Sequence, residues 1–158
     1  MKILFSFSFL LFPFFVFAQA PDINEFHTDG CTLAPDGTFD RPDLWRECCV
    51  NHDLWYWGGG TKHLRSLVDK NLEECITSKA GSFIATLFYF GVRSGSISPV
   101  KFDQKKWGNA WKKDLPEYRV LNTEEKKILL KHLEHQQSYP DLINQYVQFL
   151  QNSRVEGE

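Results

Sequence analysis

The sequence predicts a mainly α-helical fold whose centre is an antiparallel pair of helices. Apolar and cysteine residues recur at helical spacing from position 42 onwards, and no segment has the alternation typical of a β-strand. Three consecutive glycines, Gly58 to Gly60, allow only a short connection between the first two helices. Helices joined by so short a link lie antiparallel, and further helices are predicted toward the C-terminus.

Start and stop signals define the first two helices. Residues 22–43 have no apolar periodicity and are expected to form an ordered loop. Asp40 and Pro42 suit the cap and first turn of a helix that ends at the glycine turn. Thr61 can cap the second helix, which is expected to run to about Ser78. Its predicted inner face carries Leu64, Leu67, Val68, Leu72, Cys75 and Ile76.

Three helical segments are predicted in the second half of the chain. The first begins at Ser82, continues through Phe90 and is broken up by Gly91, Gly95 and Pro99. The other two are opened by Thr123 and Pro140 and cover residues 124–137 and 140–152.

Residues 1–20 have the pattern of a secretory signal peptide. Lys2 precedes an apolar run that is too short to span a bilayer, and small residues allow cleavage after Ala18 or Ala20. We therefore expect a secreted or periplasmic protein, with one domain over residues 21–153 and a flexible tail over 154–158.

The charge of the chain gives no reason to expect a nucleic-acid partner. The chain has 18 basic and 20 acidic residues, and the predicted signal contains one of the basic ones. A slightly acidic protein has no general attraction to nucleic acid or to anionic membranes. The sequence leaves the oligomeric state unknown.

The glycine turn pairs residues across the first two helices. His52 and Asp69 are placed almost symmetrically about this turn, and so are Cys48 and Cys75. An imidazole that donates one N–H to a buried carboxylate keeps its other nitrogen free to take a proton from water. We therefore predict a catalytic His52–Asp69 dyad that activates water, the alternative being a histidine that is simply buried in the core.

The cysteines predict disulfides. An even number of four in a secreted chain indicates two disulfides, for which three pairings exist. The hairpin favours Cys48 with Cys75. A disulfide between Cys31 and Cys49 would then hold the preceding loop against the helical turn of His52.

Carboxylates near His52 predict a calcium site. Asp53 points about 100° around the helix from His52 and can face the loop that contains Asp29 and Asp36. Clustered oxygen ligands suit calcium, although Asp36 fits better as a stabiliser of its own turn. A zinc site is the competing interpretation, but adjacent cysteines lack the usual zinc spacing. Its ligands would be Cys48, Cys49, His52 and His63.

The segment from Cys48 to Tyr56, with Asp69, Cys75 and the loop from Thr28 to Asp36, resembles secreted phospholipase A2. The shared features are paired cysteines, two spacers, His-Asp, two more spacers and a tyrosine. The short loop is closest to the prokaryotic type, since the glycine-rich calcium loop of the animal and venom enzymes is missing. The resemblance covers roughly residues 28–75, and none is found from Ser82 onward.

The resemblance implies a function and the roles of the site residues. It implies a calcium-dependent hydrolase that cleaves an acyl ester of glycerophospholipids, with His52 and Asp69 catalytic and Tyr56 hydrogen-bonded to Asp69. It implies that calcium is held by the Asp29 carboxylate, the Gly30 carbonyl and the Asp53 carboxylate. The expected oxyanion donors are calcium and the backbone N–H of Gly30. The alternatives are a catalytically silent lipid- or partner-binding module, and a hydrolase or acyltransferase that acts on a different ester.

Aromatic residues leave two interpretations open. Those from Phe83 to Phe90 fit a core, or the rim of a channel for an acyl chain. Trp107 and Trp111 lie among lysines and fit peripheral contact with a membrane surface, or anchoring of an exposed loop. Surface or packing roles are expected for His27, His63, His132 and His135.

Overall fold

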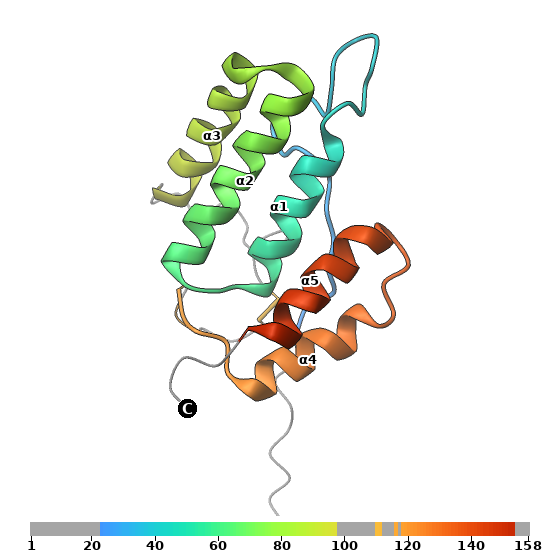
Figure 1. Ribbon diagram of the computed structural model, residues 1–158, viewed down its shortest axis with the longest axis vertical. Helices are drawn as coiled ribbons and strands as arrows, with labels where there is room; N and C mark the ends of the chain where they lie inside the picture. Colours follow the sequence, from blue (N-terminus) through green and yellow to red (C-terminus); the bar gives the residue numbers. More distant parts are fainter. Residues whose placement is uncertain (1–22, 98–109, 112–115, 117, 154–158) are drawn as a thin grey trace, which may run out of the picture.

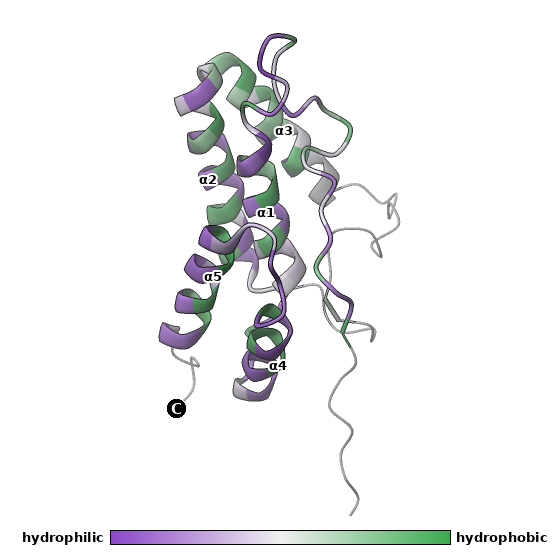
Figure 2. Cartoon of the chain, turned by 90° about the vertical axis from the view of Figure 1, so that its right-hand side faces the viewer, coloured by the Kyte–Doolittle hydropathy of each residue, from purple (hydrophilic) through white to green (hydrophobic). Residues whose placement is uncertain are grey.

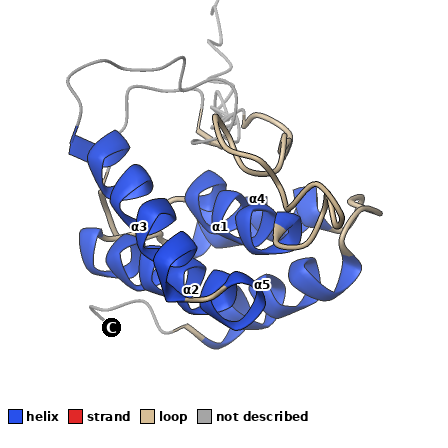
Figure 3. Ribbon diagram, turned by 90° about the horizontal axis from the view of Figure 1, so that it is seen from above, coloured by secondary structure: helices blue, strands red, loops and turns tan. Residues whose placement is uncertain are grey.

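The computed structural model describes residues 23–97, 110–111, 116 and 118–153. Five helices form its regular structure: α1 (Arg46–Gly58), α2 (Lys62–Ala80), α3 (Ser82–Ile97), α4 (Thr123–Leu133) and α5 (Pro140–Asn152). The described residues contain no strand, only an isolated antiparallel bridge between Ile23 and Trp111 (Figure 3). The prediction of a mainly α-helical protein is therefore confirmed. The predicted signal peptide and tail lie outside the described residues.

The helices form two groups. α1, α2 and α3 lie side by side, and α5 packs against α1 with α4 beside it (Figure 1). One apolar cluster joins α1 to α4 and α5, and a second joins α1 to α2 and α3 around the cysteines. The hydrophilic and hydrophobic sides of α2 and α5 are visible in Figure 2. No helix within the described ranges is long and apolar enough to cross a membrane.

The first helix begins later than the sequence predicts. α1 starts at Arg46, and Asp40 is an exposed residue of the preceding loop. The reason is tertiary: the Trp45 backbone N–H donates to the Asp36 carbonyl at 2.9 Å, and its indole N–H donates to the Pro35 carbonyl at 2.7 Å. These bonds hold the residues before α1 against the loop, so that the helix cannot extend to Pro42.

The turn between α1 and α2 is as short as predicted. Gly59 and Gly60 have φ values of 86° and 147°, which favour glycine over residues that carry a Cβ. The side chain of Thr61 accepts a hydrogen bond from the Leu64 backbone N–H, so the predicted cap is present. The helix that follows runs to Ala80, two residues beyond the predicted end.

Helix α3 differs from the prediction because Gly91 and Gly95 do not break it. The cost of a glycine in a helix is about 1 kcal/mol, which tertiary packing can outweigh. α3 packs along α2 over its length, and Phe88 meets Trp45 edge to face with ring centroids 6.1 Å apart. The prediction that Leu67 faces inward is wrong, since it is 47% exposed.

The last two helices agree with their predicted starts within one residue. Asn122 caps α4 in a capping box with Glu125, and α5 begins at Pro140 and ends at Asn152 as predicted. α4 ends at Leu133, earlier than the predicted residue 137. Trp55, Tyr146 and Phe149 form an aromatic contact between α1 and α5.

We predict that Gly58→Ala destabilises the protein by roughly 1–3 kcal/mol, the range for overpacking a core. An added Cβ would lie 1.8 Å from Tyr146 Oη, and the Tyr146 ring is held by Trp55 and Phe149. The matched control is Gly91→Ala, where a Cβ meets nothing within 4 Å. The control should stabilise α3 by roughly 0.5–1 kcal/mol. Urea unfolding of both variants measures the difference, and equal stabilities would contradict the packing described here.

Candidate active site

The side chains of His52 and Asp69 meet between α1 and α2. His52 Nε2 lies 2.9 Å from Asp69 Oδ1, Asp69 has no exposed surface, and His52 is 9% exposed. The same two helices are joined by a Cys48–Cys75 disulfide, with a Cα–Cα distance of 5.8 Å. Both contacts are the ones that symmetry about the glycine turn predicts. Chemically, the carboxylate can hold the imidazole in one orientation and one tautomer.

Asp69 receives two further hydrogen bonds. Tyr56 Oη donates to Oδ1 at 2.7 Å, which is the contact implied by the phospholipase A2 resemblance. Arg93 Nη1, from α3, donates to Oδ2 at 2.9 Å. Tyr56 also stacks on the His52 ring at a centroid distance of 4.3 Å. The histidine is therefore fixed both by its hydrogen bond and by a neighbouring ring.

The protonation behaviour of the pair follows from these contacts. Burial by itself raises the pKa of Asp69, but the hydrogen bonds from His52, Tyr56 and Arg93 outweigh it and hold the pKa below its usual value. Burial lowers the pKa of His52, but the nearby carboxylate of Asp53 and the hydrogen-bonded carboxylate of Asp69 outweigh that effect and raise it. Asp69 is therefore an anion at neutral pH, and His52 has enhanced proton affinity.

The other nitrogen of His52 faces Asp53. Nδ1 lies 3.9 Å from Asp53 Oδ1, which is too long for a hydrogen bond. Asp53 Oδ2 accepts a hydrogen bond of 2.7 Å from Thr28 Oγ1. Nδ1 is thus the nitrogen on which a proton from a substrate water could be placed, on the side of the Thr28–Asp36 loop.

That loop is fastened to α1 by a disulfide and an ion pair. Cys31 and Cys49 form the second disulfide, with a Cα–Cα distance of 5.1 Å. Asp36 pairs with Arg46, and its other oxygen accepts a hydrogen bond from the Cys31 backbone N–H at 2.6 Å. Asp36 therefore stabilises the loop, as the sequence favours.

One backbone N–H of the loop differs from the expected set of oxyanion donors. The Gly30 backbone N–H, which we expected to stabilise an oxyanion, donates to Thr28 Oγ1 at 3.1 Å.

The zinc interpretation is wrong, because Cys48 and Cys49 are both in disulfides and His63 is exposed on α2.

Asp53 is a partly buried carboxylate that feels the charge of a second carboxylate, Asp29. Burial raises the pKa of Asp53, and the nearby charge of Asp29 raises it further. Asp29 is exposed, with Oδ1 accepting a hydrogen bond from Thr32 Oγ1 at 2.9 Å. Two carboxylates that raise each other's energy are stabilised by a divalent cation, and calcium accepts carboxylate, carbonyl and water oxygens. No group of three or more His, Cys, Asp and Glu side chains in the described part of the chain could hold a metal. Calcium would therefore need backbone, water or substrate oxygens as well.

The structure adds residues that sequence reasoning missed. Arg93 contacts Asp69, and Arg65, which is buried, lies with its guanidinium 4.3 Å from the centre of the Tyr56 ring. Thr28 links the loop to Asp53. A signal for Arg93 exists in the sequence, since Asp69 and Arg93 are equally distant from Gly81, where α2 and α3 meet. The expected break at Gly91 concealed it.

The structure also places the aromatic residues and the histidines for which the sequence predicts no catalytic role. Of the two interpretations of Trp111, the structure supports the anchoring one, because Trp111 is buried and donates to the Gly58 carbonyl at 3.1 Å. Trp107 and its neighbouring lysines lie outside the described residues. Phe83, Leu87 and Phe90 are exposed on one face of α3 rather than buried in a core.

Exposed His27 lies 3.8 Å from Glu25, and His132 and His135 are on or just after α4.

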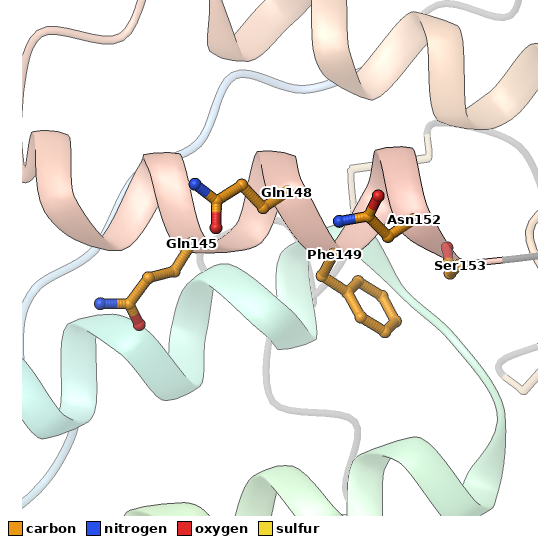
Figure 4. Close-up of a pocket in the computed structure, with 5 residues that line it drawn as sticks. All are labelled: Gln145, Gln148, Phe149, Asn152 and Ser153. Carbon is orange, nitrogen blue, oxygen red and sulfur yellow. The ribbon is translucent and has the colours of Figure 1, made fainter.

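A surface hollow lies on α5, away from this constellation. It is lined by the amide side chains of Gln145, Gln148 and Asn152 together with Phe149 and Ser153 (Figure 4). None of these residues is part of the predicted site. Phe149 connects the hollow to α1 through its contact with Trp55.

Comparisons with known proteins give no assignment. No family model, no curated protein and no solved structure matches this chain. We therefore infer the function from the residues and their geometry.

Proposed function

We propose that the protein is a secreted, calcium-dependent hydrolase of the phospholipase A2 type, which cleaves an acyl ester of glycerophospholipids. The observation that carries this proposal is the 2.9 Å contact between His52 Nε2 and buried Asp69, with Nδ1 directed toward the Asp53 side. This arrangement supports a role for His52 as a general base that activates water. The two disulfides are compatible with an extracellular location.

The reaction follows from the two nitrogens of His52. A water bound at Nδ1 attacks the ester carbonyl carbon while Nδ1 takes its proton, and Asp69 stabilises the imidazolium formed. The C–O bond to the glycerol then breaks, and Nδ1 returns the proton to the departing alkoxide. The products are one fatty acid and one lysophospholipid, and His52 is again neutral.

Calcium would be held by the carboxylates of Asp29 and Asp53 and the carbonyl of Gly30. When bound, it supplies positive charge for the substrate phosphate and for the developing charge on the ester oxygen. The disulfide at Cys31 and the bond from Thr28 to Asp53 keep this loop close to His52. Asp53, one of these ligands, also lies next to Nδ1 of His52, so the residues that would hold calcium adjoin the nitrogen that takes the proton.

Contact with the lipid surface fits the exposed apolar face of α3. Phe83, Leu87 and Phe90 are 75%, 55% and 62% exposed. They are spaced by four and three residues, so they lie on one side of the helix. This face also favours the alternative, a silent module that binds lipid without cleaving it.

Fatty-acid release from mixed phospholipid vesicles by the oxidised protein tests the proposal, with calcium present or removed by excess chelator. Release that requires calcium is the expected result. Vesicle binding without release, by protein shown to be folded, would support the silent module. Hydrolysis of another ester, but not of phospholipid, would change the proposed substrate class and leave the proposed site unchanged.

A further inference from the structure

We propose that Arg93 of α3 is a positioning residue that keeps the His52–Asp69 dyad in its reactive arrangement. By pairing with Asp69 Oδ2, it keeps Asp69 an anion and the mobile proton on His52 Nε2, so that Nδ1 is free to act as base. Its effect on turnover rests on the proposed function, but its effect on the histidine does not. The phospholipase A2 resemblance, which ends before α3, assigns no residue here.

The burial of Asp69 makes a charged partner necessary. Asp69 has no exposed surface, and an ionised carboxylate in such a place is costly unless it is paired. Of its three donors described above, Tyr56 is neutral, and His52 must be neutral before it takes a proton. Arg93, with Nη1 2.9 Å from Oδ2, brings a formal positive charge to the carboxylate before the reaction starts.

The two oxygens of Asp69 are used differently. Oδ1 accepts from His52 at 2.9 Å and from Tyr56 at 2.7 Å, whereas Oδ2 accepts from Arg93. An Asp69 without the guanidinium would be a more basic carboxylate, because only neutral donors would oppose its burial. It would then take up a proton from solvent more readily. A protonated Asp69 donates to Nε2, which leaves the ring proton of neutral His52 on Nδ1, and a histidine that carries its proton on Nδ1 cannot take a proton from water there.

The fold places Arg93 at the level of Asp69. α2 and α3 are joined at Gly81, and residues equally distant from that joint face each other along the pair. α3 must continue through Gly91 to bring Arg93 there, which it does. The Arg93 side chain is 30% exposed, whereas the Asp69 side chain has no exposed surface, so the positive charge reaches the buried carboxylate from the edge of the site.

Two variants separate the charge of Arg93 from its bulk. Arg93→Met removes the charge and the donor, and Arg93→Lys keeps the charge. The matched control is Lys70→Met, which removes an exposed cation next to Asp69 in sequence whose Nζ lies over the Tyr89 ring at 5.1 Å. Thermal unfolding establishes that each oxidised, full-length variant is folded.

The first readout is nitrogen-15 NMR of the His52 ring, which needs no activity. The wild type, Arg93→Lys and Lys70→Met should carry the proton on Nε2, and Arg93→Met should lose that signature in part or whole. Identical ring spectra in Arg93→Met and Lys70→Met would overturn the proposal. If Arg93→Met does not fold, Arg93→Lys tests the proposal instead. A folded lysine variant without the Nε2–H signal would show that a positive charge at this position does not keep the proton on Nε2.

The second readout is the split between kcat and KM for fatty-acid release. Arg93→Met should lower kcat by roughly 10–100-fold, the effect typical of residues that orient a catalytic group, with KM changed little. Arg93→Lys should restore most of kcat. An unchanged kcat in folded Arg93→Met would contradict the inference. If the wild type releases no fatty acid, the proposed function fails, and the ring spectra still decide the role of Arg93.

Discussion

His52→Gln is expected to lower kcat for fatty-acid release by roughly 10²–10⁴-fold, the usual contribution of a general base. Glutamine can still donate an amide N–H to Asp69, so the buried carboxylate keeps a partner in place of the Nε2 contact of 2.9 Å. It has no nitrogen that can take a proton from water at neutral pH. We therefore expect a folded protein with near-normal substrate binding and very slow turnover.

The matched control for this variant is His63→Gln, which makes the same change at an exposed position of α2. It should leave kcat within a factor of about two, because a surface substitution of this kind changes little. Single-turnover kinetics and thermal unfolding should be measured on both variants. Full activity of folded His52→Gln would eliminate the dyad mechanism, whereas equal losses in both variants would indicate a defect unrelated to the site.

The centre of the candidate site was predictable because it depends on symmetry about a turn. A hairpin with so short a link fixes the register of two helices, so the sequence spacing alone brings His52 to Asp69 and Cys48 to Cys75. Both the local signal of the glycines and the cap at Thr61 agree with that tertiary arrangement. Local and global preferences that agree in this way make a sequence easy to interpret.

The errors arose where tertiary contacts outweigh local preference. Asp40 and Pro42 are good start signals, yet hydrogen bonds from Trp45 to the loop delay α1 to Arg46. Gly91 is a helix breaker by propensity, yet packing on α2 carries α3 through it. The same error hid Arg93, because a helix that ends at residue 90 never reaches the level of Asp69.

Burial of aromatic residues was the least predictable property. Trp111 stands among basic residues in the sequence, a pattern that fits an interface, but its indole N–H finds the Gly58 carbonyl and the ring is buried. Phe83 and Phe90 stand in an apolar run that fits a core, but they are exposed. Side-chain burial depends on which elements meet, and the apolar content of a short segment does not specify this.

Asp53→Asn is expected to raise the calcium dissociation constant by more than about tenfold, since a charged oxygen ligand is lost. The same substitution should also change the stability of the calcium-free protein. Burial and the charge of Asp29 raise the pKa of Asp53, so its ionised form costs stability at neutral pH in calcium-free protein. Asparagine removes that cost and can still accept the hydrogen bond from Thr28. The calcium-free variant should be at least as stable as the wild type.

Thermal unfolding with and without calcium measures both effects, because a ligand that binds only the folded state stabilises it in proportion to the logarithm of its concentration over Kd. The wild type should gain stability with calcium, and Asp53→Asn should gain much less. Asp43→Asn is the matched control, at an exposed carboxylate of the loop before α1. A calcium-dependent gain that Asp53→Asn retains in full would move the metal away from Asp53. A variant that is less stable than the wild type without calcium would show instead that the Asp53 carboxylate stabilises the fold. The proposed calcium site predicts the opposite, because a carboxylate that is placed to bind a cation lowers the stability of the protein until the cation binds.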